Sequence, residues 1–82
     1  MNVKIDHFLD ITSEVCPMTF VRTRLLIEKI GTGETAEIRL KGQEPLENVP
    51  NSVAELGHDV LKIQPEGNSA QTDVHCILIR KN

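Results

Sequence analysis

The sequence predicts an α/β fold, a two-layer sandwich of order βαβαββ in which a mixed four-stranded sheet carries two helices on one face. Apolar residues at helical spacing occupy two segments that alternate with short strand-like segments. The run 74–79 is apolar at almost every position, which is typical of a central strand. A turn-rich connector before it predicts an antiparallel hairpin. With 82 residues, the chain is expected to form a single domain, 1–82.

Residues 8–11 form the first expected strand, and a helix is expected over 17–30. Proline at a first helical position is pre-set for a helix start, so Pro17 marks the beginning. Helical spacing predicts one core face, made of Phe20, Thr23, Leu26, Ile27 and Ile30. The segment 31–33, Gly-Thr-Gly, is expected to end the helix, with one glycine in the left-handed conformation directly after it.

A second, smaller apolar stripe lies on nearly the opposite side of this helix. Met18, Val21 and Leu25 share its spacing, and Arg22 is among the basic residues that flank it. One interpretation is a docking surface for a partner protein, formed by these residues with Pro17. The other is a set of scattered boundary residues, which is normal on protein surfaces. The sequence favours neither.

The second half of the chain continues the alternation. Residues 35–40 alternate as a half-exposed strand, and a right-handed crossover makes this strand parallel to the first. A second helix should open at Pro45, kink or restart near residues 51–52 because Pro50 cannot donate a hydrogen bond, and end at Gly57. A strand over 59–64 and a strand over 72–80 complete the sheet. The side chains expected to point inward from these last elements are Leu46, Val49, Val53 and Leu56 of the helix and Leu61 and Ile63 of the strand.

Composition excludes several classes of function. A formal charge of −3 with interspersed signs, no Trp or Tyr and two Phe argues against direct nucleic-acid binding. Two cysteines are too few for a disulfide scaffold. The first residues lack the apolar stretch of a signal peptide, and no apolar run is long enough to span a bilayer. We therefore expect a cytoplasmic protein.

Cys16 is the candidate catalytic residue, because it precedes Pro17 and is the expected N-cap of the first helix. The first N–H groups of a helix lack internal partners, and this end carries partial positive charge. A sulfur there is biased toward the thiolate, which is the nucleophilic form, and the same end would stabilise a persulfide anion. The alternative is a small, apolar cysteine buried at a strand-to-helix junction.

The remaining candidates point to structural roles. Cys76 lies mid-strand among aliphatic residues, so a buried, inert thiol is expected. The three histidines do not cluster and zinc-type spacings are missing, so neither a metal site nor a cofactor is expected. Asp10 and Glu14 lie near Cys16, where a carboxylate would oppose thiolate formation. We expect them to serve the hydrogen bonding of the loop.

The strand–loop–Cys16-Pro17–helix arrangement resembles the TusA/SirA-like family of small sulfur carriers. The resemblance covers roughly residues 8–81 and includes the Leu-Asp-Ile at 9–11, Lys-Ile before a Gly-x-Gly turn, Glu-Pro at 44–45, Val-Pro at 49–50 and the closing strand at 77–81. The family motif is Cys-Pro-x-Pro. Here Thr19 replaces the second proline.

This resemblance implies a sulfurtransferase-type relay in which Cys16 carries persulfide sulfur from a donor, a cysteine desulfurase or rhodanese-like protein, to an acceptor sulfur-relay protein. The pathway stays open among tRNA thiolation, cofactor assembly and sulfur oxidation, and Thr19 speaks against the first. The residues also allow a non-catalytic interaction or regulatory module, or a thiol redox sensor in which Cys16 is oxidised to sulfenic acid.

Overall fold

A computed structural model describes residues 5–15, 18–66 and 73–82. Its elements follow the order β1 (His7–Asp10), α1 (Met18–Lys29), β2 (Thr35–Lys41), α2 (Gln43–Glu55), β3 (Asp59–Pro65) and β4 (Val74–Arg80). The four strands form one sheet in the order β1-β2-β4-β3. The predicted βαβαββ order is therefore confirmed.

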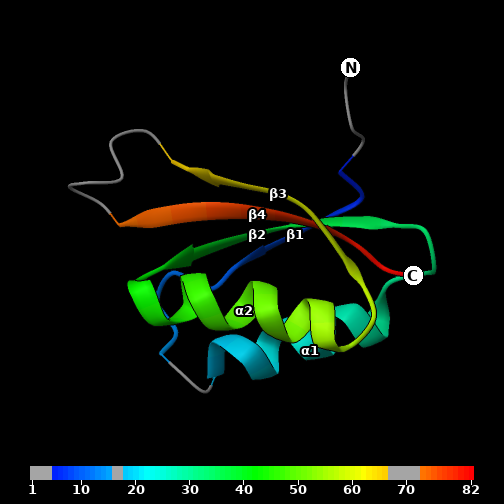
Figure 1. Ribbon diagram of the computed structural model, residues 1–82, viewed down its shortest axis with the longest axis horizontal. Coiled ribbons are helices and arrows are strands. Elements are labelled where there is room, and N and C mark those ends of the chain that lie inside the picture. Colours follow the sequence, from blue (N-terminus) through cyan, green and yellow to red (C-terminus); the bar gives the residue numbers. More distant parts are fainter. Residues whose placement is uncertain (1–4, 16–17, 67–72) are drawn as a thin grey trace.

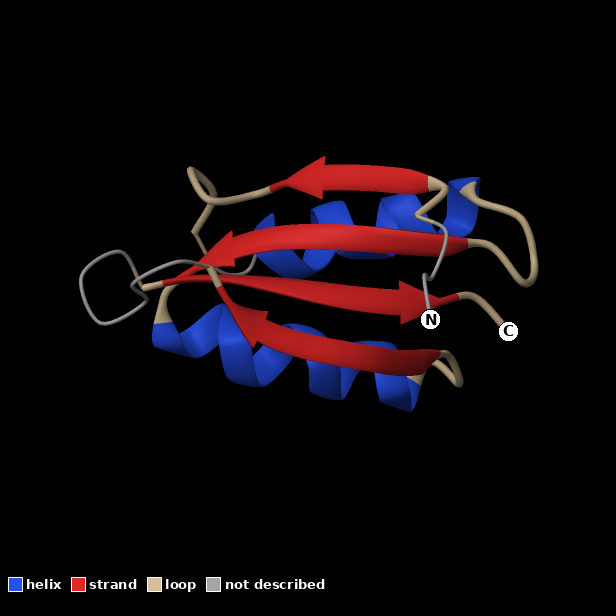
Figure 2. Cartoon of the chain, turned by 90° about the horizontal axis from the view of Figure 1, so that it is seen from above, coloured by secondary structure: helices blue, strands red, loops and turns tan. Residues whose placement is uncertain are grey.

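The sheet is mixed, as predicted. β1 pairs with β2 in parallel, whereas β4 is antiparallel to both of its neighbours, β2 and β3. Figure 1 shows both helices on one side of the sheet, and Figure 2 shows α1 behind the β1–β2 half and α2 behind the β3 half. Neither helix of the described residues covers the other face of the sheet. β1 and β3 are the two edge strands.

The core lies between the sheet and the two helices. Alternate residues of β2 and β4 point into it and are fully buried, since successive strand residues face opposite sides of a sheet. The helices contribute Ile27, Val49 and Val53, and Ile11 enters from the loop after β1. The strand residues of this core are Ala36, Ile38, Leu40, Ile77 and Ile79.

Helix α1 buries a slightly different face from the predicted one. Thr23, Ile27 and Ile30 are buried as expected, but Phe20 and Leu26 are only half-buried. Thr19, which was not assigned to the core, is completely buried. At about 100° per residue, Thr19 lies closer to the centre of the buried face than Phe20 does. Helix α1 packs against α2, and its Ile27 belongs to the core shared with the sheet.

A kink or a restart was predicted near residues 51–52 of helix α2, and the restart is wrong. The helix runs from Gln43 to Glu55 without interruption, and both Pro45 and Pro50 are buried in its packed face. Burial of the Pro50 ring offsets the loss of one helical hydrogen bond. Leu56, predicted to be inward, is 44% exposed. It is the C-cap residue, and the chain turns away directly after it.

The end of α2 follows the predicted chemistry closely. Gly57 has φ 90°, the left-handed conformation that favours glycine. Its N–H donates to the Ala54 carbonyl at 3.0 Å, and the His58 N–H donates to the Val53 carbonyl at 3.1 Å. These two bonds define a Schellman motif. After α1, in contrast, the left-handed glycine is Gly33 (φ 87°) and not Gly31, the first glycine after the helix.

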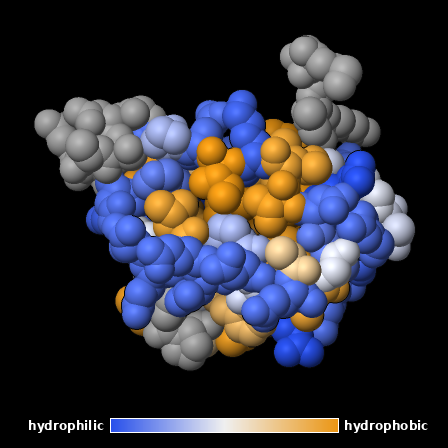
Figure 3. All heavy atoms as spheres, in the orientation of Figure 1, coloured by the Kyte–Doolittle hydropathy of each residue, from blue (hydrophilic) through white to orange (hydrophobic). Residues whose placement is uncertain are grey.

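Strand β3 contains a β-bulge that changes which side chains face the core. Val60 lies opposite Ile79 but Lys62 lies opposite Leu78, so Leu61 is an extra residue in the ladder. Leu61, predicted to be inward, is 42% exposed, and Val60 packs against the core. Ile63 lies opposite the buried Ile77, on the helix side of the sheet as predicted, but it is 48% exposed on this edge strand. Figure 3 shows the resulting apolar surface on the side where β3 and α2 lie.

Candidate functional site

The predicted nucleophile and its neighbour, Cys16 and Pro17, lie outside the described residues. So do the predicted N-cap position and the solvent access of the sulfur. The structure does describe both flanks. Val15 is 75% exposed, and Met18, the first residue of α1, is 43% exposed. The Met18 N–H donates to the Val15 carbonyl at 2.8 Å, so the two flanks are bonded to each other across the intervening pair.

The loop before Cys16 is anchored at its start. Ile11 is completely buried, and its N–H donates to the Arg39 carbonyl of β2 at 2.8 Å. Asp10 Oδ1 accepts the Thr12 N–H at 2.9 Å and the Thr12 hydroxyl at 2.7 Å, and Glu14 N–H donates to the Ile11 carbonyl at 3.1 Å. The predicted role of Asp10 in the loop's hydrogen bonding is therefore confirmed.

The first turn of α1 carries no acidic residue that would offset the partial positive charge of the helix end. Glu14, in the loop, lies 3.9 Å from an Arg22 guanidinium nitrogen, so its charge is partly offset. Among the described residues, the first turn of α1 therefore adds no negative charge to this end of the helix, and its first N–H, that of Met18, is bonded to Val15.

The predicted second stripe of α1 is exposed. Met18, Val21 and Leu25 expose 43%, 38% and 56% of their surface, opposite the buried face of the helix. Next to the stripe, an open groove of about 570 Å³ lies between α1 and β1. Its apolar floor and charged rim are formed by Leu9, Leu25, Leu26, Arg22, Glu28 and Lys29. Leu25 belongs to both the stripe and the groove, and Arg22, which flanks the stripe, also lines the groove. The stripe and the groove therefore form one continuous surface.

Cys76 lies on the sheet face away from the helices and is only half-buried, so the prediction of a buried thiol is wrong. Its Sγ donates to Glu66 Oε2 at 3.5 Å. Burial, reinforced by hydrogen bonding to Glu37 and Glu66, raises the pKa of the Cys76 thiol to about 12. A pKa this high keeps the thiol protonated near neutral pH, which supports the predicted low reactivity, with the two carboxylates adding to the effect of burial.

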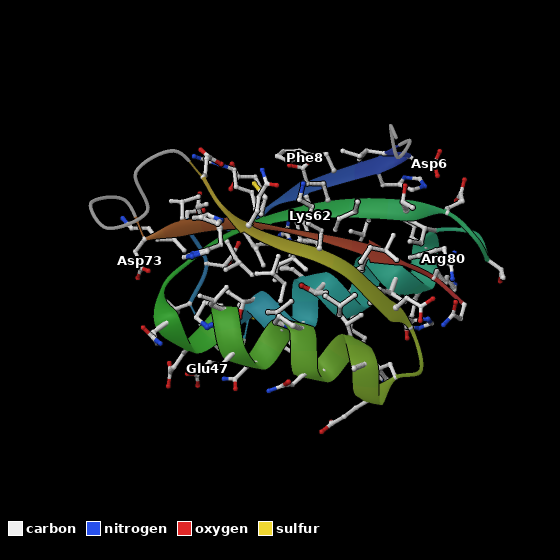
Figure 4. All side chains as sticks on the ribbon, turned by 45° about the horizontal axis from the view of Figure 1, so that its top comes forward. Asp6, Phe8, Glu47, Lys62, Asp73 and Arg80 are labelled. Atoms are coloured by element: carbon white, nitrogen blue, oxygen red, sulfur yellow. The ribbon has the colours of Figure 1, made fainter. Side chains whose placement is uncertain are left out.

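Arg39 connects three parts of the chain on this open face. Its Nε and Nη2 donate to the two carboxylate oxygens of Glu66 at 2.7 and 2.8 Å, and its Nη1 donates to Asp10 Oδ2 at 3.1 Å. Figure 4 shows this face obliquely, with Phe8 of β1 and Lys62 of β3 labelled. Arg39 thus bridges β2 to the end of β1 and to the residue after β3.

The family comparison covers almost the whole chain. A family model described as "Sulfurtransferase TusA" matches residues 7–81. The chain belongs to the TusA family. Two relatives carry the name "Putative sulfur carrier protein": one from Archaeoglobus fulgidus is 34% identical over 79 residues, covering 96% of this chain and 85% of the relative. One from Thermotoga maritima is 36% identical over 66 residues, covering 80% and 84%.

The TusA-family fold is also found in a solved structure. The crystal structure of a SirA-like protein from Desulfitobacterium hafniense has a TM-score of 0.76 to this chain at 16% identity, and covers 90% of this chain and 95% of its own. The likeness shows the same fold. Together with the family match, the names of the two relatives support a sulfur-carrier role for this TusA-family protein.

The bridge that Arg39 makes to Asp10 and Glu66 was not predicted from the sequence. The alternating pattern of residues 35–40 predicts only that Arg39 points outward, and Glu66 lies in the turn-rich connector before the last strand. Neither pairing has a local sequence signal, because the partners lie 29 and 27 positions away. Parallel pairing of β1 with β2 offered one usable clue, since it places Asp10 opposite Arg39.

The described part of the chain holds neither a candidate metal-binding cluster nor a candidate membrane-spanning helix. Across residues 5–15, 18–66 and 73–82, no cluster of three or more His, Cys, Asp or Glu side chains could hold a metal ion. Neither α1 nor α2 is long and apolar enough to cross a membrane.

Proposed function

We propose that this TusA-family protein relays persulfide sulfur on Cys16 between a donor protein and an acceptor protein. The family match over residues 7–81 carries the proposal, and in the sequence Cys16 lies between β1 and α1. The relay would operate in the cytoplasm, where thiols stay reduced.

The transfer is thiol–disulfide exchange carried out twice. The Cys16 thiolate attacks the outer sulfur of a donor persulfide, R–S–SH. A new S–S bond forms on Cys16, the donor S–S bond breaks, and the donor leaves as the thiolate R–S⁻. A thiolate of the acceptor then attacks the outer sulfur on Cys16 in the same way. Electrons balance within each exchange, so the step needs no metal, oxidant or organic cofactor.

The local electrostatics favour the thiolate that this chemistry needs. Residue 16 lies two positions before the first residue of α1, and the first turn of that helix has no acidic residue. An anion at this end is stabilised by the helix dipole and by N–H groups without intrahelical partners. Cysteines at helix N-termini have lowered pKa values for this reason.

The docking surface we propose for both partners consists of Pro17, Met18, Val21, Arg22 and Leu25. The four residues from α1 are exposed and share a surface with the groove beside β1. The stripe begins at the first residue of α1, so a partner held there would lie next to residue 16. Apolar contact through Met18 suits adaptable recognition of more than one protein. The rim charge of Arg22 would orient the partner.

Mass spectrometry tests the relay directly. The protein is incubated with a cysteine desulfurase and cysteine, and its intact mass is measured. We expect a gain of one sulfur in the wild type and in Cys76→Ser, and no gain in Cys16→Ser. Transfer to an acceptor thiol protein should then return the mass to its starting value. A sulfur gain in Cys16→Ser, or none in the wild type, contradicts the relay.

Partner binding and the intact mass after peroxide treatment separate the alternatives. A docking module would bind partners equally well in Cys16→Ser, since the exposed stripe of α1 is intact in that variant. A redox sensor would gain one oxygen after mild peroxide treatment and no sulfur from the desulfurase.

A further inference from the structure

We propose that Asp10 is a positioning residue for Cys16, in that its carboxylate fixes the start of the loop that leads to Cys16. The inference rests on the sulfur relay proposed above and concerns the same site.

The two oxygens of the Asp10 carboxylate have separate partners. Oδ1 accepts the main-chain N–H and the hydroxyl of Thr12, at 2.9 and 2.7 Å, and so holds the turn that follows β1. Oδ2 accepts Nη1 of Arg39 at 3.1 Å. The side chain therefore fastens the loop to the sheet instead of pointing freely into solvent. Exposed carboxylates without such a role usually keep side-chain freedom that costs free energy to restrict.

Arg39 is itself held in place from the other side. Its bidentate contact with Glu66 fixes the plane of the guanidinium group, and its own carbonyl accepts the N–H of Ile11. One residue of β2 thus holds Asp10 through its side chain and Ile11 through its main chain. Bidentate Arg–carboxylate pairs restrict geometry more than single contacts do.

The arrangement reconciles two electrostatic requirements. A carboxylate close to a cysteine opposes thiolate formation. Here the Arg39 guanidinium offsets the charge of Asp10, while the Oδ1 bonds to Thr12 remain available to shape the loop. Hydrogen bonds from the main chain and hydroxyl of Thr12, with Arg39 beside them, lower the pKa of Asp10, so the carboxylate stays ionised near neutral pH.

The test measures the pH–rate profile of Cys16 alkylation by iodoacetamide in a Cys76→Ser background, where Cys16 is the remaining thiol. Asp10→Ala should release the loop from Arg39 and the sheet, so the apparent pKa of Cys16 should rise toward about 8.5, the value of a free thiol. A rise of about one unit lowers the thiolate fraction at pH 7, and with it the rate of sulfur loading, about tenfold. Thr12→Val, which removes one of the two Oδ1 bonds, should give a smaller rise.

Asp59→Ala is the matched control. Asp59 is 42% exposed against 43% for Asp10, and it also pairs with an arginine, Arg80, at 2.6 Å, but at the opposite end of the sheet. This control should lose stability without changing the Cys16 profile. Unfolding in urea identifies any variant that fails to fold, and Thr12→Val then carries the test.

The direction of the shift decides the outcome. If Asp10 acts only as a nearby negative charge, Asp10→Ala will lower the pKa of Cys16, and the positioning role is overturned. An unchanged profile would mean a purely structural role and would overturn it as well. Failure of the relay itself is seen separately, because the wild type would then gain no sulfur from the donor, whatever the variants do.

Discussion

Thr23 donates its hydroxyl hydrogen to the main-chain carbonyl of Thr19, one helical turn earlier, at 2.8 Å, and both side chains are fully buried. The bond explains how the Thr23 hydroxyl is tolerated where α1 meets the core, because a buried hydroxyl group needs a partner. Thr19 stands where the family motif has its second proline, and its complete burial makes it a core residue. The first turn of α1 is therefore fixed by side-chain packing.

Thr23 offers a direct test of this packing. Thr23→Val keeps the volume and removes the hydroxyl, while the Thr19 carbonyl can still accept its main-chain helical bond. We expect the free energy of unfolding to change by no more than about 1 kcal/mol. Thr23→Ala also leaves a cavity and should cost about 1–2 kcal/mol more. Urea unfolding measures both, and equal costs for Val and Ala would contradict the argument.

The proposed docking stripe is tested by charge insertion. Met18→Glu and Leu25→Glu place a carboxylate on the exposed face of α1 without touching the core. We expect sulfur loading from the donor to slow at least about tenfold, since interface hot spots cost more than about 1 kcal/mol. Leu56→Glu is the control, because Leu56 is similarly exposed (44%) but lies at the end of α2. Equal loading rates in all three variants would rule out the stripe.

Stability should fall in acid. Arg39 holds the pKa of Glu66 below its usual value, and Arg80 does the same for Asp59. A carboxyl group whose pKa is lowered by folding contributes stability above its unfolded pKa of about 4, and this contribution is lost as pH falls through the folded value. The unfolding free energy should change little from pH 7 to 5 and then decrease toward pH 3.

Glu66→Gln isolates one contribution to this acid sensitivity. Glutamine cannot titrate and pairs less strongly with Arg39, so the variant should be less stable than the wild type at pH 7 and lose less stability between pH 5 and 3. Urea unfolding at pH 7, 5 and 3 gives the comparison. A variant with the same decrease as the wild type would show that Glu66 does not contribute.

Cys76 should be almost unreactive in the folded protein. With a pKa of about 12, its thiolate fraction at pH 8 is at least roughly a hundredfold below that of a free thiol. In Cys16→Ser, alkylation at pH 8 should therefore be slow in buffer and fast in urea. Glu66→Gln should speed the reaction in buffer, because it replaces a carboxylate that accepts the thiol hydrogen. Fast alkylation of the folded Cys16→Ser variant would contradict the assignment.

Local patterns predicted the elements well, because their causes are local. Alternation in β2 gave a half-exposed strand, and the apolar run of β4 gave a central one. The Schellman motif at Gly57 followed from the preference of glycine for positive φ. Predictions failed where a residue's environment depends on packing partners. Leu61 is exposed because a bulge shifts the register of β3, and the helix continues past Pro50 because its ring is buried.

By itself, the sequence determined the order of the strands and helices, the exposed stripe Met18, Val21 and Leu25, and the choice of Cys16 as the candidate nucleophile. Each follows from spacing along one element or from a motif of adjacent residues. Only the tertiary structure decided that Thr19 belongs to the core, that Cys76 faces the open side of the sheet beside Glu66, and that Arg39 joins Asp10 to Glu66. The reason is that these contacts join residues brought together by the pairing of strands and the packing of layers, which short-range periodicity does not encode.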